Sequence, residues 1–132
     1  MHMILSDFQY KNPRLVNMTF SERNVDGAIP ENLVIQNKFH VGVEKHETKQ
    51  EARVTLSAVI GDLEVAPFMI TVAVAADFEW KELPEESIDS MLQINAPALL
   101  LGFLRPIVFS ITNVSRYPAY NIPFINFRDN TP

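Results

Sequence analysis

Hydrophobic and polar residues alternate along the first three-fifths of the chain, which is the spacing of strands that bury one face. The alternation predicts four strands, at about residues 7–22, 33–46, 51–60 and 65–80. The Asn12-Pro13-Arg14 step interrupts the first run. Because proline cannot donate to a strand ladder, we expect that strand to lie at an edge of the sheet or to be bulged there. Residues 24–31 have the composition of a loop, and Gly61-Asp62 favours a tight hairpin turn.

The fourth run differs from the others because both of its faces lack charge over most of its length. Its even-numbered face carries large apolar residues, and its odd-numbered face carries small or neutral ones. A strand that is apolar on both faces needs a second cover, from a helix or from another subunit. We therefore expect the odd-numbered residues to form a subunit interface. They are Met69, Thr71, Ala73 and Ala75.

From residue 85 the spacing of apolar residues changes to three and four, which predicts helical structure to about residue 114. Gly102 and Pro106 lie four residues apart within it, so we expect a kink there. Prolines exclude much helix beyond that point and favour an extended tail over residues 115–132. Four strands followed by a helical segment is an α+β pattern, and 132 residues suit one domain over residues 1–132.

The composition is that of a folded, soluble chain, with 47% hydrophobic and 20% charged residues. The absence of cysteine excludes disulfide scaffolds and thiol catalysis. The longest nearly apolar stretch, residues 96–111, contains Arg105 and is too short for a membrane span. The Met1-His2-Met3 start lacks the basic and apolar regions of a secretory signal, so we expect a cytoplasmic protein.

Negative charge is concentrated in one short segment. The net charge is −5, and residues 77–89 hold six carboxylates against one lysine. This segment is either a solvated loop and helix start or an acidic docking face for a basic partner. The residues of that face would be Asp77, Glu79, Glu82, Glu85 and Glu86. No basic stripe is present, so nucleic acid is not an expected partner.

No catalytic or cofactor motif stands out. The chain has no phosphate loop, dinucleotide glycine pattern or serine nucleophile elbow, and it has only four glycines. His40, Glu44 and His46 share one strand face, but about 3.3 Å per residue separates the two histidines by about 20 Å, too far to bind one ion. We expect no enzyme activity, no cofactor and no metal site.

Aromatic residues are more numerous than one small core requires, with nine Phe, three Tyr and one Trp. One interpretation is core packing together with an oligomer interface. The other is a groove that binds extended apolar segments, because aromatic and methionine side chains offer large, adaptable contact areas.

The C-terminal third resembles a known family. The run at residues 95–100, the pair Phe103 and Arg105, Tyr117-Pro118 and the run at residues 122–127 are similar in order and spacing to the SecB protein-export chaperones. The resemblance extends loosely over residues 7–128. It implies a four-stranded antiparallel sheet with helices on one face, assembled as a tetramer that is a dimer of dimers. It also implies an ATP-independent holdase that keeps preproteins unfolded in the cytoplasm.

The resemblance further implies that client segments lie in a hydrophobic groove. It maps groove positions onto Phe68, Phe103 and Phe127, and we add Trp80 and Phe124 because they lie close to these motifs.

Several features depart from the family pattern. The chain stops five residues after Phe127, where SecB proteins continue into a helix and a tail that contacts the SecA motor. Residues 69–76 carry no charge, whereas the family tends to place an acidic residue for SecA there. A proline follows Arg105, where the family commonly has an acidic or polar residue. SecA is therefore a doubtful partner. The alternative is a chaperone or adaptor dedicated to one partner, such as the antitoxin of a toxin–antitoxin module.

Overall fold

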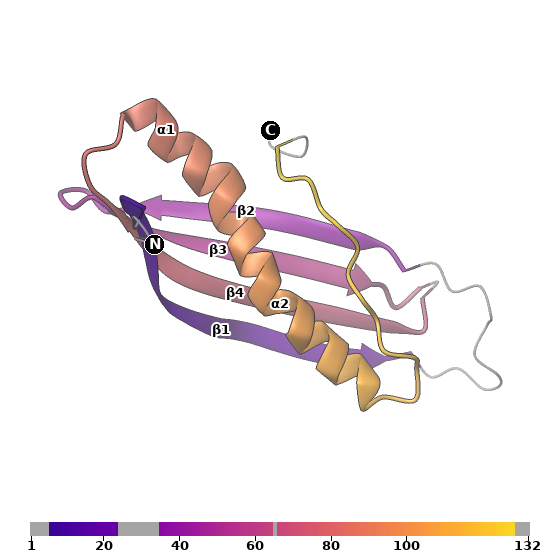
Figure 1. Ribbon diagram of the computed structural model, residues 1–132. Helices are drawn as coiled ribbons and strands as arrows, with labels where there is room; N and C mark the ends of the chain where they lie inside the picture. The colour runs from indigo at the N-terminus through magenta and orange to yellow at the C-terminus, as the bar shows by residue number, and fades with distance from the viewer. Residues whose placement is uncertain (1–5, 24–34, 65, 129–132) are drawn as a thin grey trace, which may run out of the picture.

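The computed structural model describes residues 6–23, 35–64 and 66–128, and it shows one antiparallel sheet with a joined helix laid across a single face (Figure 1). The strands are β1 (Phe8–Glu22), β2 (Asn37–Lys45), β3 (Glu51–Gly61) and β4 (Phe68–Trp80). The helical segment consists of α1 (Glu85–Ser90), a π-helical turn η1 (Met91–Asn95) and α2 (Ala96–Asn113). The predicted four-stranded antiparallel α+β fold is thereby confirmed. The expected loop at residues 24–31 and the expected strand starts at residues 33 and 65 lie outside the described residues.

The strand order is β1-β4-β3-β2, so β1 and β2 form the edges and β4 lies inside the sheet. The pairing of β1 with β4 shifts register between Lys11 and Arg14, and Asn12 adopts a positive φ of 55° there. Both expectations for this strand, an edge position and a bulge at Pro13, are confirmed. The extra residues of a bulge are tolerated because an edge strand has a neighbour on one side only.

The connection between β3 and β4 is wider than predicted. The prediction of a tight Gly-X turn at Gly61-Asp62 is wrong, because residues 62–67 separate the two strands. Gly61 has a φ of 77°, and a Cβ at this position would overlap the carbonyl of Phe68. The Asp62 carboxylate accepts hydrogen bonds from the backbone N–H groups of Glu64 (2.8 Å) and Ala66 (3.1 Å), which fixes the loop without a tight turn.

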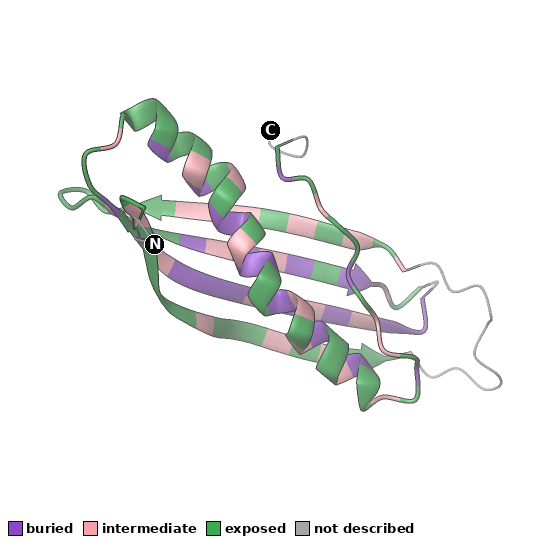
Figure 2. Cartoon of the chain, in the orientation of Figure 1, coloured by how far each residue is buried: buried purple, intermediate pink, exposed green. Residues whose placement is uncertain are grey.

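The core lies between the helix and the face of the sheet that carries the even-numbered residues of β3 and β4 (Figure 2). Leu56, Ile70, Leu100, Leu104 and Val108 are all fully buried. Helix α2 crosses the strands diagonally, so part of this sheet face lies beside the helix rather than beneath it (Figure 1).

The helical segment contains an irregular turn that the sequence did not predict. Helix α2 continues without a break through Gly102 and Pro106 to Asn113, and the kink expected at these residues stays a prediction. The departure from α-helical geometry is η1, where the N–H of Ala96 bonds to the carbonyl of Met91. Pro97 follows immediately and has no N–H for the preceding turn, and a wider turn accommodates its ring.

The tail crosses the sheet beside α2. Residues 118–126 contain no helix or strand, and they run from the β1 and β4 side to the β2 side of the molecule (Figure 1). The tail buries three side chains against the core, namely Tyr117, Ile122 and Phe127. It therefore completes the layer that α2 begins.

Candidate functional site

The five aromatic residues predicted to line a groove are divided between the core and the surface. Phe68 is 1% exposed, and Trp80 and Phe127 are also buried. Phe103 is 38% exposed and Phe124 is 95% exposed. A client can thus reach two of the five residues directly, and it can reach the other three only if α2 or the tail moves.

The solvent side of α2 is an apolar surface that sequence reasoning did not single out. We call it the outer helix face, and it comprises Gly102, Phe103, Pro106 and Phe109, all exposed. Arg105 is the only charged residue between positions 91 and 115. The sequence does indicate this surface, because the predicted helix lacks charge on every side, whereas a surface helix normally carries charge on its solvent side.

The length and hydropathy of residues 85–113 would also suit a membrane span, but the core helix of a folded domain passes the same test. Here one side of the helix contacts the sheet through Leu100, Leu104 and Val108. Only 33% of its most apolar stretch is buried within the chain. A large exposed apolar surface on a helix that already packs against a sheet marks an interaction site.

The residues predicted as a subunit interface lie on the opposite side of the sheet, which we call the outer sheet face. Met69, Thr71 and Ala73 are half-buried there, and Ala75 is buried although no described helix covers this side. Arg14 and Thr55 lie directly beside Ala75 on the neighbouring strands and shield it. The interface role of these four residues stays a prediction.

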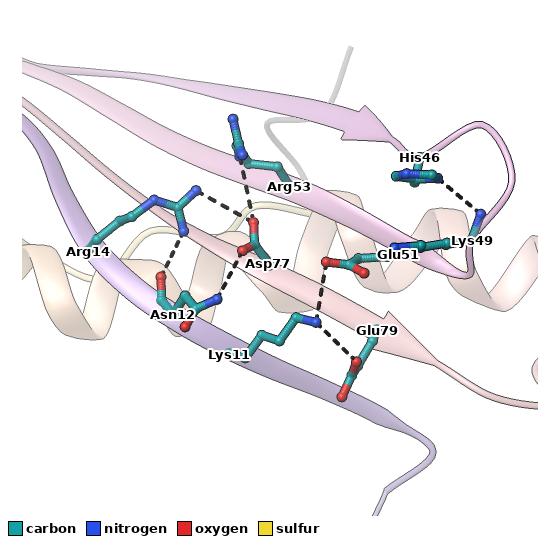
Figure 3. A network of polar contacts seen from close by, with 9 residues as sticks. All are labelled: Lys11, Asn12, Arg14, His46, Lys49, Glu51, Arg53, Asp77 and Glu79. Atoms are coloured by element: carbon teal, nitrogen blue, oxygen red, sulfur yellow. Dashed lines mark hydrogen bonds and ion pairs between the residues drawn. The ribbon is translucent and has the colours of Figure 1, made fainter.

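The predicted acidic face separates into two groups. Asp77 and Glu79 lie on the outer sheet face among basic side chains (Figure 3). Glu82, Glu85 and Glu86 are exposed at and before the start of α1. Lys11 lies 3.5 Å from Glu79 and 3.4 Å from Glu51, and these two carboxylates raise the pKa of Lys11. Only the second group remains an open acidic surface.

Asp77 holds the β1 bulge in place. Its carboxylate accepts a hydrogen bond from Asn12 (3.4 Å) and forms ion pairs with Arg14 (3.5 Å) and Arg53 (3.6 Å) (Figure 3). Burial alone raises the pKa of Asp77, but the hydrogen bond from Asn12 and the two arginine charges outweigh it, so the pKa lies below its ordinary value. The folded state therefore prefers the ionised carboxylate.

Asp77→Asn should lower the free energy of unfolding by about 1 kcal/mol at pH 7. Because the folded pKa is depressed, this stabilisation is present above the unfolded pKa of about 3.9 and disappears as the pH falls through the folded value. The difference between wild type and variant should therefore shrink as the pH is lowered below the unfolded pKa and vanish once the folded carboxyl is also protonated. Urea unfolding followed by the fluorescence of Trp80 measures both quantities. Equal stability of the two proteins at pH 7, or a difference that persists in acid, would contradict this account.

The polar sites in the described part of the chain are a charged depression and a turn around His46. A depression of about 230 Å³ at the β2–β3 end of the sheet is lined mostly by charged residues, among them Glu44, Arg53 and Asp77. Among the described residues, no three His, Asp or Glu side chains gather as metal ligands. The ring of His46 accepts hydrogen bonds from the backbone N–H groups of Thr48 and Lys49 within its own turn. The surfaces best suited to binding are the apolar ones.

Comparison with known proteins gives the following matches. The family model "SecB: Preprotein translocase subunit SecB" matches residues 7–129. Among solved structures, a Mycobacterium tuberculosis SecB-like chaperone, Rv1957, in complex with a ChAD peptide from the Rv1956 HigA1 antitoxin, superimposes with a TM-score of 0.75 at 16% identity, over 90% of both chains. A Streptococcus agalactiae protein of unknown function gives a TM-score of 0.49 at 11% identity, over 92% of this chain and 100% of that one. No curated protein sequence matches.

The family match covers nearly all of the chain, and the structural match independently shows the same fold. Both agree with the motifs at residues 95–127 that first suggested the relationship. The chain therefore belongs to the SecB family, and its fold is that of a SecB-like chaperone.

Proposed function

We propose that this protein is an ATP-independent holdase chaperone of the cytoplasm that binds apolar segments of unfolded proteins without enzymatic turnover. The observation that carries the proposal is the amount of neutral, apolar surface that the folded chain leaves in solvent, above all the outer helix face and the ring of Phe124. Exposed apolar patches of this kind mark binding surfaces for other polypeptides. Family membership supports the same function.

Phe103 and Phe124 are the proposed first contacts for a client, because they are the exposed members of the five predicted aromatics. Phe103 lies edge-on to Tyr10 of β1, with ring centroids 6.1 Å apart. The Arg105 guanidinium lies 5.4 Å from the centroid of the Phe124 ring and orients it. The buried Phe68 and Trp80 become accessible to a client only after a movement of the chain, and the buried Phe127 lies on the tail itself.

We also propose that the protein assembles through copies of itself, as a tetramer built from two dimers. A second copy packed against Gly102, Pro106 and Phe109 would remove most of the outer helix face from water and leave Phe103, which lies beside Tyr10, open to a client. The outer sheet face, with Met69, Thr71, Ala73 and Ala75, offers a second, flatter contact.

Two classes of partner fit these surfaces. One is the broad set of unfolded preproteins destined for export, and the other is a single dedicated partner such as an antitoxin. The solved SecB-like chaperone Rv1957 holds an antitoxin peptide, which supports the second class as the alternative. The ion pairs at Asp77 and Glu79 leave no acidic sheet face, so the structure lends no support to SecA as a partner. Co-purification separates the classes, since a dedicated partner is recovered alone and in a fixed ratio.

Phe103→Ala should weaken the binding of an unfolded test protein about tenfold, which corresponds to about 1.4 kcal/mol. The wild-type protein should suppress aggregation of that test protein without ATP at a several-fold molar excess. Light scattering measures the suppression, and fluorescence anisotropy measures the affinity. Val114→Ala, another exposed apolar residue near the end of α2, is the matched control and should bind as wild type does. Failure of the wild type to suppress aggregation would contradict the holdase function.

A further inference from the structure

The tail occupies apolar space that another extended chain could fill. We name residues 117–127 the strap, and we propose that the strap sits in the binding groove for clients and that an extended apolar segment binds by displacing it. This inference rests on the proposed holdase function. It assigns Phe68 and Phe39 to the floor of the groove, and it assigns Phe127 to the segment that leaves.

The strap shows which side chains the groove accepts. Its three buried residues, Tyr117, Ile122 and Phe127, follow one another at intervals of five, and the residues between them are exposed or half-buried. The Tyr117 ring lies 5.2 Å from that of Phe68, and the Phe127 ring meets Phe39 edge-on at 6.4 Å, both measured between centroids. The preferred client is thus an extended segment with large apolar or aromatic residues about every fifth position.

The core holds the backbone of the strap by contacts that any peptide could make. Arg105 donates to the carbonyls of Ile122 (3.1 Å) and Pro123 (2.9 Å), and the Thr112 hydroxyl accepts from the N–H of Tyr120 (2.8 Å). All three bonds run from core side chains to backbone groups, which are the same in every sequence. The strap makes no backbone hydrogen bond to the described strands. A replacement segment therefore breaks no sheet ladder.

One polar group is left imperfectly satisfied while the strap is in place. The Asn37 amide nitrogen donates to the hydroxyl of Tyr120 at 2.7 Å, but the amide oxygen of Asn37 is buried without a partner among the described residues. A buried acceptor without a donor disfavours the closed arrangement. Release of the strap, or a backbone N–H of a client, relieves this cost. The strap is therefore held in the groove less strongly than the burial of its three apolar side chains alone would imply.

A tethered occupant competes with clients at a high effective concentration, on the order of millimolar for a short connection. The apparent affinity for a client falls in proportion to the fraction of molecules whose groove is open. Loosening the strap should therefore tighten binding, whereas damage to a groove residue should weaken it. The sign of the change distinguishes the two roles.

The test uses a fluorescent peptide with the sequence of residues 115–128 and the full-length protein. Ile122→Ala removes an anchor from the strap alone, and it should bind the peptide at least about tenfold more tightly than wild type does. Asn121→Ala alters the adjacent exposed residue of the strap and is the matched control, with wild-type affinity. Anisotropy titration gives the affinities, and circular dichroism verifies folding. If Ile122→Ala does not fold, Tyr120→Phe loosens the strap by removing the strap hydroxyl that accepts a hydrogen bond from Asn37. A folded loosened variant that binds no more tightly than the control overturns the inference.

An unfolded test protein serves as the second probe and separates this inference from the holdase proposal. Tighter binding of both probes by Ile122→Ala supports the strap as occupant of the client groove. Binding of the test protein with equal affinity by Ile122→Ala and Asn121→Ala overturns the inference while the holdase function stands. In a third outcome, Ile122→Ala binds the peptide more tightly, but no variant binds the test protein. This result would support the displacement of the strap from its groove. It would contradict both the holdase function and the role of the groove in binding clients.

Discussion

Gly102→Glu is expected to split the proposed tetramer into folded dimers, each made of two 15.0 kDa chains that stay joined through the outer sheet face. Gly102 belongs to the outer helix face, and a Cβ at this position would meet no atom within 4 Å in the single chain. The substitution is therefore tolerated in the monomer, and it removes a helix-interior glycine that costs up to about 1 kcal/mol. In the assembly it would bury a carboxylate in an apolar contact, which costs several kcal/mol without a partner.

Light scattering coupled to size exclusion measures the mass, and circular dichroism verifies that the variant is folded. Gly102→Ala adds a side chain without charge, so it is the matched control and should keep the assembled mass. Ala73→Glu places the same charge on the outer sheet face and tests the other predicted contact. A wild-type monomer would refute assembly altogether, and dissociation of only the Ala73 variant would move the main contact to the sheet.

Phe68→Ala should lower the free energy of unfolding by about 3 to 5 kcal/mol, the usual loss when a buried phenylalanine is truncated. The Phe68 ring stacks on Phe20 with centroids 5.7 Å apart and contacts Tyr117 of the tail. It therefore joins β1, β4 and the strap. Urea unfolding monitored by Trp80 fluorescence gives the free energy.

Phe124→Ala is the control for this measurement, because the Phe124 ring is almost wholly exposed. It should change the stability by no more than about 0.5 kcal/mol. If Phe68→Ala abolishes folding, Phe68→Leu keeps most of the volume and should cost about 1.5 kcal/mol or less. A loss below about 1 kcal/mol in the alanine variant would show that Phe68 is not part of the core.

The local pattern of the sequence predicts the strands, but it does not predict their order in the sheet. Period-two alternation is visible within a few residues, so strand ends near Glu22 and Trp80 could be predicted from the sequence. The placement of β4 between β1 and β3 depends on pairings such as Phe8 with Trp80, which lie far apart in sequence. Arg14 and Thr55 on the two neighbouring strands lie beside Ala75, and this shielding depends on the strand order, which no local pattern gives.

The candidate site was only partly accessible to sequence reasoning for a similar reason. Phe124 and Phe127 are three residues apart in the same motif, yet one is exposed and the other is buried. The difference arises from the path of the tail, which Arg105 fixes through bonds to residues 17 and 18 positions away. No local pattern encodes a contact between a helix side chain and distant carbonyl groups.

The wide turn η1 corrects the phase of the buried stripe on the helix. Ile88, Leu92, Ala96, Leu100, Leu104, Val108 and Thr112 are all buried, and they form an unbroken repeat of four. At 3.6 residues per turn such a repeat drifts around the helix axis by about 40° per step, or about 240° from the first member to the last. A turn that holds more residues than an α-helical turn cancels part of this drift. Because the sheet has a right-handed twist, the direction of the sheet surface also changes along the helix, and this accommodates the drift that remains. One irregular turn thus allows a single long helix to keep one side on the sheet and the other free for a partner.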